Sequence, residues 1–132
     1  MSDFKHIGQP HQFQKILVVD DEPLIRLLVI DTLEELGHLV VEAGSARQAI
    51  AALDADPAIG LLVTDVNLPG GIDGHQLVEI VRAKKRDLKV LFITGHAAGD
   101  DVADQATHVM TKPFLAETLA THVHELLSVP TT

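Results

Sequence analysis

Polar residues that could share one site follow the short apolar runs of this sequence. They are Asp20 and Asp21 after the first run, Asp65 after the third, Thr94 at the end of the fourth, and Lys112 with Pro113 after the fifth. A single aspartate after a strand is more often a turn residue or a helix cap, but here three carboxylates recur at equivalent points. Crowded carboxylates repel one another unless a cation holds them, and oxygen ligands suit Mg²⁺ better than a soft metal. The pattern therefore predicts an acidic Mg²⁺ site next to a lysine ammonium.

The apolar runs predict the strands that position these residues. They cover residues 16–19, 39–41, 61–63, 90–93 and 109–110. Between them, apolar residues recur at the spacings of three and four that are typical of amphipathic helices, although residues 94–108 carry this pattern poorly. The alternation predicts an α/β fold, a doubly wound five-stranded parallel sheet with flanking helices on both faces. Such sheets form their site at the carboxyl ends of the strands, where the polar residues follow.

Composition limits the size of the protein and its partners. The 132 residues suit one domain, which we expect over residues 15–128, between a polar tail at 1–14 and a short tail at 129–132. A formal net charge of -9 disfavours direct binding to nucleic acid. The chain has no cysteine, no apolar leader and no run near the ~20 residues that span a bilayer. We therefore expect a cytoplasmic protein without membrane contact.

Four blocks of the sequence resemble the motifs of the response regulator receiver family in their order and register. They are LVVDDEP, LLVTDVNLP, FITGHA and TKPF. The resemblance covers roughly residues 15–127 and implies the flavodoxin-like receiver fold. It also implies a signalling phosphoacceptor of a two-component system or phosphorelay, which is not an enzyme. A histidine kinase or a histidine phosphotransfer protein would be the donor, and a downstream protein effector would receive the signal.

The resemblance assigns roles to the residues around the metal. Asp65 would be the nucleophile that is phosphorylated. Asp21, Asp65 and the main-chain carbonyl of Asn67 would bind Mg²⁺ directly, and Asp20 would act mainly through a bound water. Attack on a phosphohistidine gathers charge on the phosphoryl oxygens, so catalysis needs positioning and positive charge and no general base.

Further roles follow for the residues around the phosphoryl group. The Lys112 ammonium would neutralise its charge, and the Thr94 hydroxyl would donate a hydrogen bond to it. Gly95 would leave space for the donor histidine to approach. Pro113 would carry a cis peptide that aims Lys112 into the site.

Departures from the family pattern bear on regulation. We expect the fourth helix to be short or irregular, and Val109 stands where the family often has the aromatic residue that reports phosphorylation. After Thr94 the only Lys or Arg is Lys112, so a homodimer, if one forms, would not use the usual charged face. His96 and Asn67 would border the path of the attacking water and tune the lifetime of the phosphoaspartate.

The first helix has more apolar residues than one buried face needs. Its core face is assigned to Ile25, Leu28, Val29, Leu33 and Leu36, and Gly37 is placed to end the helix. Leu24, Leu27 and Ile30 then form a stripe at spacing three on the other side. An exposed apolar stripe usually marks a partner, and here we expect the phosphotransfer domain or kinase. Isolated apolar residues on an ordinary surface are the alternative.

Other functions fit the residues less well. A phosphatase of the haloacid dehalogenase type needs an Asp-x-Asp motif, whereas Asp20 and Asp21 are adjacent. A flavodoxin-like electron carrier needs a hydroxyl-rich loop where this chain has acid, and an aromatic content of 3% leaves little to stack on a flavin. A receiver-like module that is never phosphorylated is disfavoured by the complete set of site residues.

Two features of the carboxyl-terminal part bear on metal binding and on output. His122 and His124 are two residues apart and do not share a helix face, which disfavours a metal site made by that pair. After Val129 the sequence has only Pro-Thr-Thr, so we expect output through a partner. A stand-alone regulator, a phosphorelay shuttle and a receiver from a hybrid kinase all fit this pattern.

Overall fold

Six strands form one sheet in the part of the chain that the structure, a computed structural model, describes, namely residues 14–95 and 101–129. The strands are β1 (Lys15–Val19), β2 (Leu39–Ala43), β3 (Ile59–Asp65), β4 (Lys89–Thr94), β5 (Asp101–Asp104) and β6 (Thr107–Thr111). They lie in the order β2-β1-β3-β4-β6-β5, and every neighbouring pair except β5 with β6 is parallel. Five parallel strands confirm the predicted doubly wound sheet.

An antiparallel edge strand, β5, lies directly before β6, in the segment where we expected a short or irregular fourth helix, of which residues 96–100 lie outside the described residues. Strand β5 pairs with β6, with Asp104 opposite Thr107, and the Asp104 carboxylate accepts a hydrogen bond from the Ala106 N–H at 2.8 Å. An aspartate whose carboxylate accepts a hydrogen bond from the backbone N–H two residues later stabilises a tight turn. Val102 is the only large apolar residue between Thr94 and Val109. A helix there would bury almost no apolar face, whereas an edge strand gains backbone hydrogen bonds from β6.

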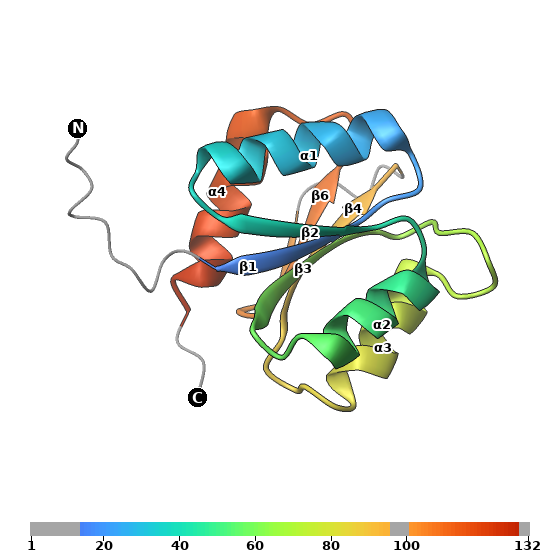
Figure 1. The fold of residues 1–132 in the computed structure, drawn as a ribbon. Helices are drawn as coiled ribbons and strands as arrows, with labels where there is room; N and C mark the ends of the chain where they lie inside the picture. Colours follow the sequence, from blue (N-terminus) through green and yellow to red (C-terminus); the bar gives the residue numbers. More distant parts are fainter. Residues whose placement is uncertain (1–13, 96–100, 130–132) are drawn as a thin grey trace.

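Four helices in the described residues cover the two faces of the sheet. They are α1 (Pro23–Glu35), α2 (Ala46–Ala55), α3 (Gly74–Arg82) and α4 (Ala116–Leu127). Figure 1 shows α1 and α4 on one face and α2 and α3 on the other. Along β1, Ile16 and Val18 pack in the cluster that contains α1 and α4, and Leu17 and Val19 pack in the opposite one. None of the described helices has the length and apolar character needed to cross a membrane.

Local signals set the ends of these helices as the sequence suggests. The Ser45 side chain accepts a hydrogen bond from the Gln48 N–H and caps α2. Asp73 and Gln76 form a reciprocal capping box that starts α3. Gly37, with a φ of 94°, follows the end of α1, which confirms the predicted helix stop.

The buried face of α1 is narrower than we expected from the sequence. Val29 and Leu33 are buried, whereas Leu28 and Leu36, which we assigned to the core, are exposed. Ile30, which we assigned to the exposed stripe, is partly buried against the core. The correction has a geometric cause, since the sheet contacts only the stripe centred on Val29 and Leu33, and Leu36 lies beyond the last turn.

Candidate functional site

The sheet topology brings the predicted site residues to one edge. From β1 the chain passes to β2 on one side and then to β3 on the other, so the strand order reverses at β1. Asp20 directly follows β1, Asp65 ends β3, and Lys112 directly follows β6. In an open parallel sheet, the crevice at this reversal is where ligands bind.

Three carboxylates meet in this crevice. Asp20, Asp21 and Asp65 can each offer one carboxylate oxygen, and these oxygens lie within 4.8 Å of one another. Asp20 and Asp65 are buried, while Asp21 is exposed. Burial, and to a smaller degree the charge of Asp65, raises the pKa of the Asp20 carboxyl to about 6, although the hydrogen bond from the Glu22 N–H opposes this.

The two carboxylate oxygens of Asp20 differ in their hydrogen bonding, and this difference bears on whether a cation fits the site. Its Oδ1 accepts the hydrogen bond from the Glu22 N–H at 2.8 Å. Its Oδ2 is buried and has no hydrogen-bond partner among the described residues. A buried carboxylate oxygen in this state is costly unless a positive group approaches it. The donor set is made of oxygen alone and one of its members reaches solvent, so the residues present fit a hard divalent cation.

Lys112 supplies the positive charge of the site. Its Nζ lies 2.9 Å from Asp65 Oδ2, 2.7 Å from Glu22 Oε1 and 4.0 Å from Asp20 Oδ2. Burial alone would lower the pKa of this ammonium, but the hydrogen bonds to Glu22 and Asp65 and the nearby carboxylate charges outweigh burial and raise the pKa. The Lys112–Pro113 peptide bond is cis, as the resemblance implied. Lys112 is therefore held charged beside Asp65.

The remaining predicted residues of the crevice lie next to Asp65 and Lys112. Thr94 is buried at the end of β4, and its carbonyl accepts a hydrogen bond from the Lys112 N–H at 2.8 Å. The Asn67 N–H donates to Asp65 Oδ1 at 3.0 Å. Among the described residues, no atom would lie within 4 Å of a Cβ added to Gly95.

Three residues that support the site were missed by the sequence analysis. Glu22 binds Lys112, and Arg26 donates from Nη1 to the Asp20 carbonyl at 2.6 Å and from Nε to Glu42 at 3.0 Å. Gly74 lies so close to β3 that a Cβ would overlap the Asp65 carbonyl and come within 2.9 Å of Val66 Cα. Only Glu22 had a signal in the sequence, its position directly after the paired aspartates. The other two depend on contacts between distant parts of the chain.

Of the other predicted residues, Val109 and the apolar residues of α1 lie outside this crevice. His96 lies outside the described residues. Val109, on β6, pairs with Phe92 of β4 and is partly buried against the cluster that contains α2 and α3. On α1, Leu24 and Leu27 are exposed as predicted, and Leu28 joins them in place of Ile30.

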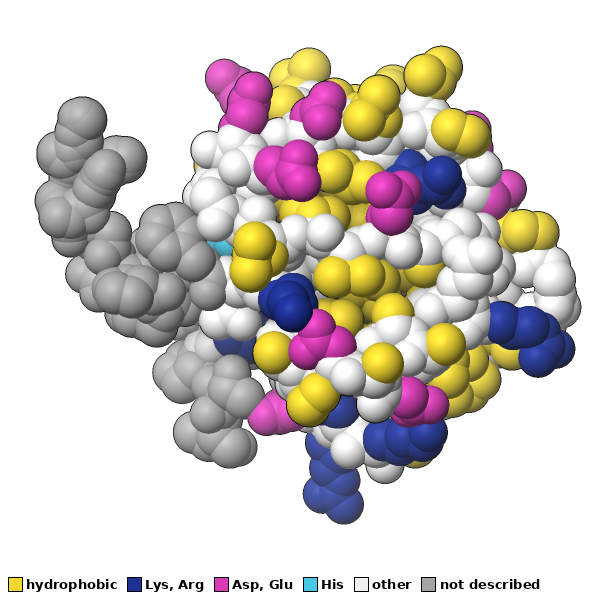
Figure 2. Space-filling model, viewed as in Figure 1, with side chains coloured by type: hydrophobic (Ala, Val, Ile, Leu, Met, Phe, Trp, Pro, Cys, Tyr) yellow, Lys and Arg dark blue, Asp and Glu magenta, His cyan; other side chains and the backbone are white. Residues whose placement is uncertain are grey.

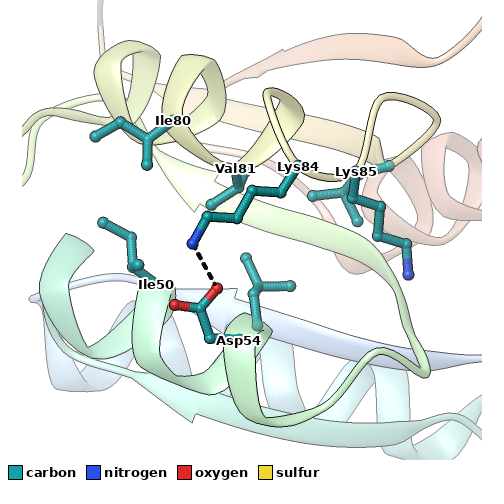
Figure 3. A pocket seen from close by; sticks show the side chains of 8 residues that line it. Ile50, Asp54, Ile80, Val81, Lys84 and Lys85 are labelled. Atoms are coloured by element: carbon teal, nitrogen blue, oxygen red, sulfur yellow. Dashed lines mark hydrogen bonds and ion pairs between the residues drawn. The ribbon is translucent and has the colours of Figure 1, made fainter.

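A separate groove of about 40 Å³ runs between α2 and α3. Figure 3 shows Ile50 and Ile80 on its two sides, with the 3.0 Å ion pair between Lys84 and Asp54 across it. The groove shares no lining residue with the acidic crevice, and Asp54, the one carboxylate among the described residues that line it, is paired with Lys84. The acidic crevice is therefore the functional candidate.

Comparisons with known proteins agree on the family of this chain. A family model for the response regulator receiver domain matches residues 16–124. The chain is 38% identical over 109 residues to the response regulator protein FleR of Pseudomonas aeruginosa, which covers 80% of this chain and 23% of FleR. It is 30% identical to the response regulator receiver protein CpdR of Brucella abortus, with 86% of this chain and 97% of CpdR covered.

Solved structures agree with the sequence relatives. A response regulator receiver protein from Sinorhizobium medicae superposes with a TM-score of 0.79 at 32% identity, over 89% of this chain and 96% of that one. Several relatives are much longer than this chain, which spans 23% of FleR and 12% of the sensor kinase CckA of Brucella abortus. The matched region is thus one domain that occurs both alone and within larger signalling proteins.

Proposed function

The chain belongs to the response regulator receiver domain family, and from this premise we propose that Asp65 is the residue that accepts the phosphoryl group. The domain is a phosphoacceptor receiver of two-component signalling. The observation that carries the assignment of Asp65 is its position, buried at the end of β3 with Oδ2 2.9 Å from Lys112 and with Asp20 and Asp21 beside it.

The proposed reaction forms a bond between phosphorus and an Asp65 oxygen and breaks the bond between phosphorus and a histidine nitrogen of the donor. The electron pair of the broken bond returns to the departing imidazole. Negative charge builds on the phosphoryl oxygens, and Lys112 is positioned to neutralise it. Because Lys112 also binds Glu22, it can turn toward the phosphoryl group by giving up that exposed partner.

The residues around Asp65 have complementary proposed roles. Asp20, Asp21, Asp65 and the Asn67 carbonyl would hold Mg²⁺, which when bound supplies positive charge opposite Lys112. Thr94 would donate its hydroxyl to a phosphoryl oxygen, and Gly95 would leave space for the donor histidine. Asn67 and His96 would tune the lifetime of the phosphoaspartate.

We propose that α1 docks the phosphoryl donor, a histidine kinase or a histidine phosphotransfer protein. The exposed fractions of Leu24, Leu27 and Leu28 are 81%, 53% and 41%. Figure 2 shows hydrophobic side chains along the upper edge of the molecule, where Figure 1 places α1. The helix begins at Pro23, directly beside the acidic crevice, so a partner on this surface would lie next to Asp65.

The proposed output differs from that of receivers that use an aromatic switch. Val109 occupies the position of that aromatic residue, and Lys112 is the only Lys or Arg after Thr94. We therefore propose that a downstream protein effector reads the domain and that any homodimer forms through a face other than the usual charged one. A cytoplasmic location fits such donors and effectors.

Amide NMR spectra test the site assignment. They would be recorded for the protein alone, with Mg²⁺, and with Mg²⁺ plus beryllofluoride, which mimics an aspartyl phosphate. We expect Mg²⁺ to shift signals near Asp21 and Asp65, and beryllofluoride to add shifts at Thr94 and Lys112. Asp65→Asn is the control and should lose the beryllofluoride response. A wild-type spectrum that neither ion changes at this edge of the sheet would contradict the proposal.

A further inference from the structure

A second cluster of metal-ligating side chains lies away from the acidic crevice, between β6 and α4. His108 comes from β6, and His122 and Glu125 come from α4. The Nδ1 atoms of the two histidines are 2.8 Å apart, and their rings meet edge to face with centroids 5.1 Å apart. One ligand atom from each of the three residues lies within 4.8 Å of the others.

The fold explains why these three side chains meet. Met110 of β6 packs in one cluster with Leu119, Val123 and Leu126 of α4. His108 lies two residues before Met110 on the same strand and therefore faces the same helix. His122 and Glu125 are three residues apart and share one face of α4, whereas His124 is exposed. The cluster is thus built across two elements and does not use the adjacent histidine.

We propose that His108, His122 and Glu125 form a binding site for a divalent transition-metal ion of the zinc class. Two imidazole nitrogens and one carboxylate oxygen are a ligand set that Zn²⁺ accepts in tetrahedral geometry, with water in the fourth position. The histidines are buried while Glu125 is exposed, so the site has a solvent edge by which an ion enters.

The observed geometry is close to what such an ion requires. Zinc–nitrogen bonds of about 2.0–2.1 Å at a tetrahedral angle place two nitrogen ligands about 3.3 Å apart. The Nδ1 atoms of His108 and His122 are 2.8 Å apart, so they need to separate by about 0.5 Å, and both rings need to turn so that their Nδ1 lone pairs point at the ion. The ion would replace their mutual hydrogen bond.

This site differs from the acidic crevice in both chemistry and place. Nitrogen ligands favour Zn²⁺, Co²⁺ or Ni²⁺, whereas the all-oxygen crevice favours Mg²⁺. His108 precedes Lys112 by four residues, which corresponds to roughly 13 Å of extended strand. A bound ion would connect β6, the strand that leads to Lys112, to the last helix.

Zinc binding by the full-length chain tests the proposal. Zn²⁺ would be titrated by calorimetry in excess Mg²⁺, which would fill the acidic crevice. Co²⁺ would be added separately to follow the visible absorption of a tetrahedral site. We expect one zinc per chain. His122→Asn should weaken binding by more than about 100-fold, because loss of a direct ligand exceeds the 10- to 100-fold effect of losing a supporting partner. Glu125→Gln should weaken it by about tenfold or more.

Matched variants on the same helix separate this site from surface binding. His124→Asn and Glu117→Gln change exposed residues of α4 outside the cluster and should keep the wild-type affinity. The proposal is overturned if the wild type binds no zinc, or if Glu125→Gln binds it as the wild type does. Because Glu125 is exposed, Glu125→Gln keeps the fold and decides the matter even if His122→Asn does not fold.

Discussion

At the residue scale, the first residue of α3 controls where Asp65 lies. Gly74 donates its N–H to the Val66 carbonyl at 2.8 Å, and a Cβ there would overlap the Asp65 carbonyl. The obstacle is backbone, which cannot move aside as the end of a flexible side chain can. Glycine is therefore needed for α3 to approach the end of β3.

Gly74→Ala should lower the free energy of unfolding by about 1–3 kcal/mol, because overpacking of this kind forces backbone shifts. Urea unfolding followed by circular dichroism measures this change. Gly95→Ala is the matched control, since a Cβ at Gly95 meets no atom of the described residues within 4 Å, and it should leave the unfolding midpoint unchanged. Equal midpoints for Gly74→Ala and the wild type would show that the loop after Asp65 adapts without cost.

At the element scale, α1 presents apolar residues to solvent next to the site. Leu24, Leu27 and Leu28 follow the spacing of three and four that puts residues on one helix face. Val29 and Leu33 hold the opposite face in the core, so the exposed face can change without loss of packing. Substitutions on the exposed face of α1 can therefore test docking without destabilising the fold.

Leu24→Ser with Leu27→Ser should slow phosphoryl transfer from a phosphohistidine donor by about tenfold or more, since removing apolar contact area from a docked helix costs on the order of 1–3 kcal/mol. Phosphorylation by acetyl phosphate, which needs no docking surface, should be unchanged. Both rates are measured by mass spectrometry of the intact chain.

Leu39→Ser is the matched control for this prediction. Leu39 is also largely exposed, but it lies at the start of β2, the strand end opposite the acidic crevice. Its substitution should leave both rates unchanged. If the Leu24 and Leu27 substitutions slow acetyl phosphate and the protein donor equally, α1 acts on the site itself and the docking role is wrong.

At the scale of the whole molecule, folding couples to pH through a buried histidine. His38, between α1 and β2, is buried, and its Nδ1 accepts a hydrogen bond from the Gln14 N–H at 3.1 Å. Burial lowers the pKa of this imidazole below its ordinary 6.5. The folded state therefore holds His38 neutral at pH values where the unfolded chain is already protonated.

The free energy of unfolding should fall as the pH drops below 6.5, because the unfolded state then binds the extra proton. The contribution of the neutral His38 to the free energy of unfolding is fully present above pH 6.5. His38→Asn should reduce the loss between pH 7.5 and about 5.5 in urea unfolding, relative to the wild type. His124→Asn, at an exposed position, is the control and should keep the wild-type pH dependence. If His38→Asn keeps the wild-type pH dependence, His38 does not couple folding to pH.

By itself, the sequence determined the doubly wound parallel sheet and most of the acidic crevice. Short apolar runs and helical spacings are local patterns, and parallel topology forces residues after each run to the same edge. The sequence alone therefore predicted that Asp20, Asp65 and Lys112 lie in one site. The cis peptide at Lys112–Pro113 and the helix stop at Gly37 were confirmed for the same reason, because each depends on a short motif.

Only the tertiary structure decided features that depend on contacts between distant residues. Local apolar spacing does not define how much of a helix face the sheet covers. Leu28, which we expected in the core, is therefore exposed, and Ile30, which we expected to be exposed, is partly buried. Gly74 near Asp65 and His108 near His122 and Glu125 meet across separate elements, which no local pattern encodes. Strand β5 forms because β6 offers it an open edge, and that edge exists only once the sheet is assembled.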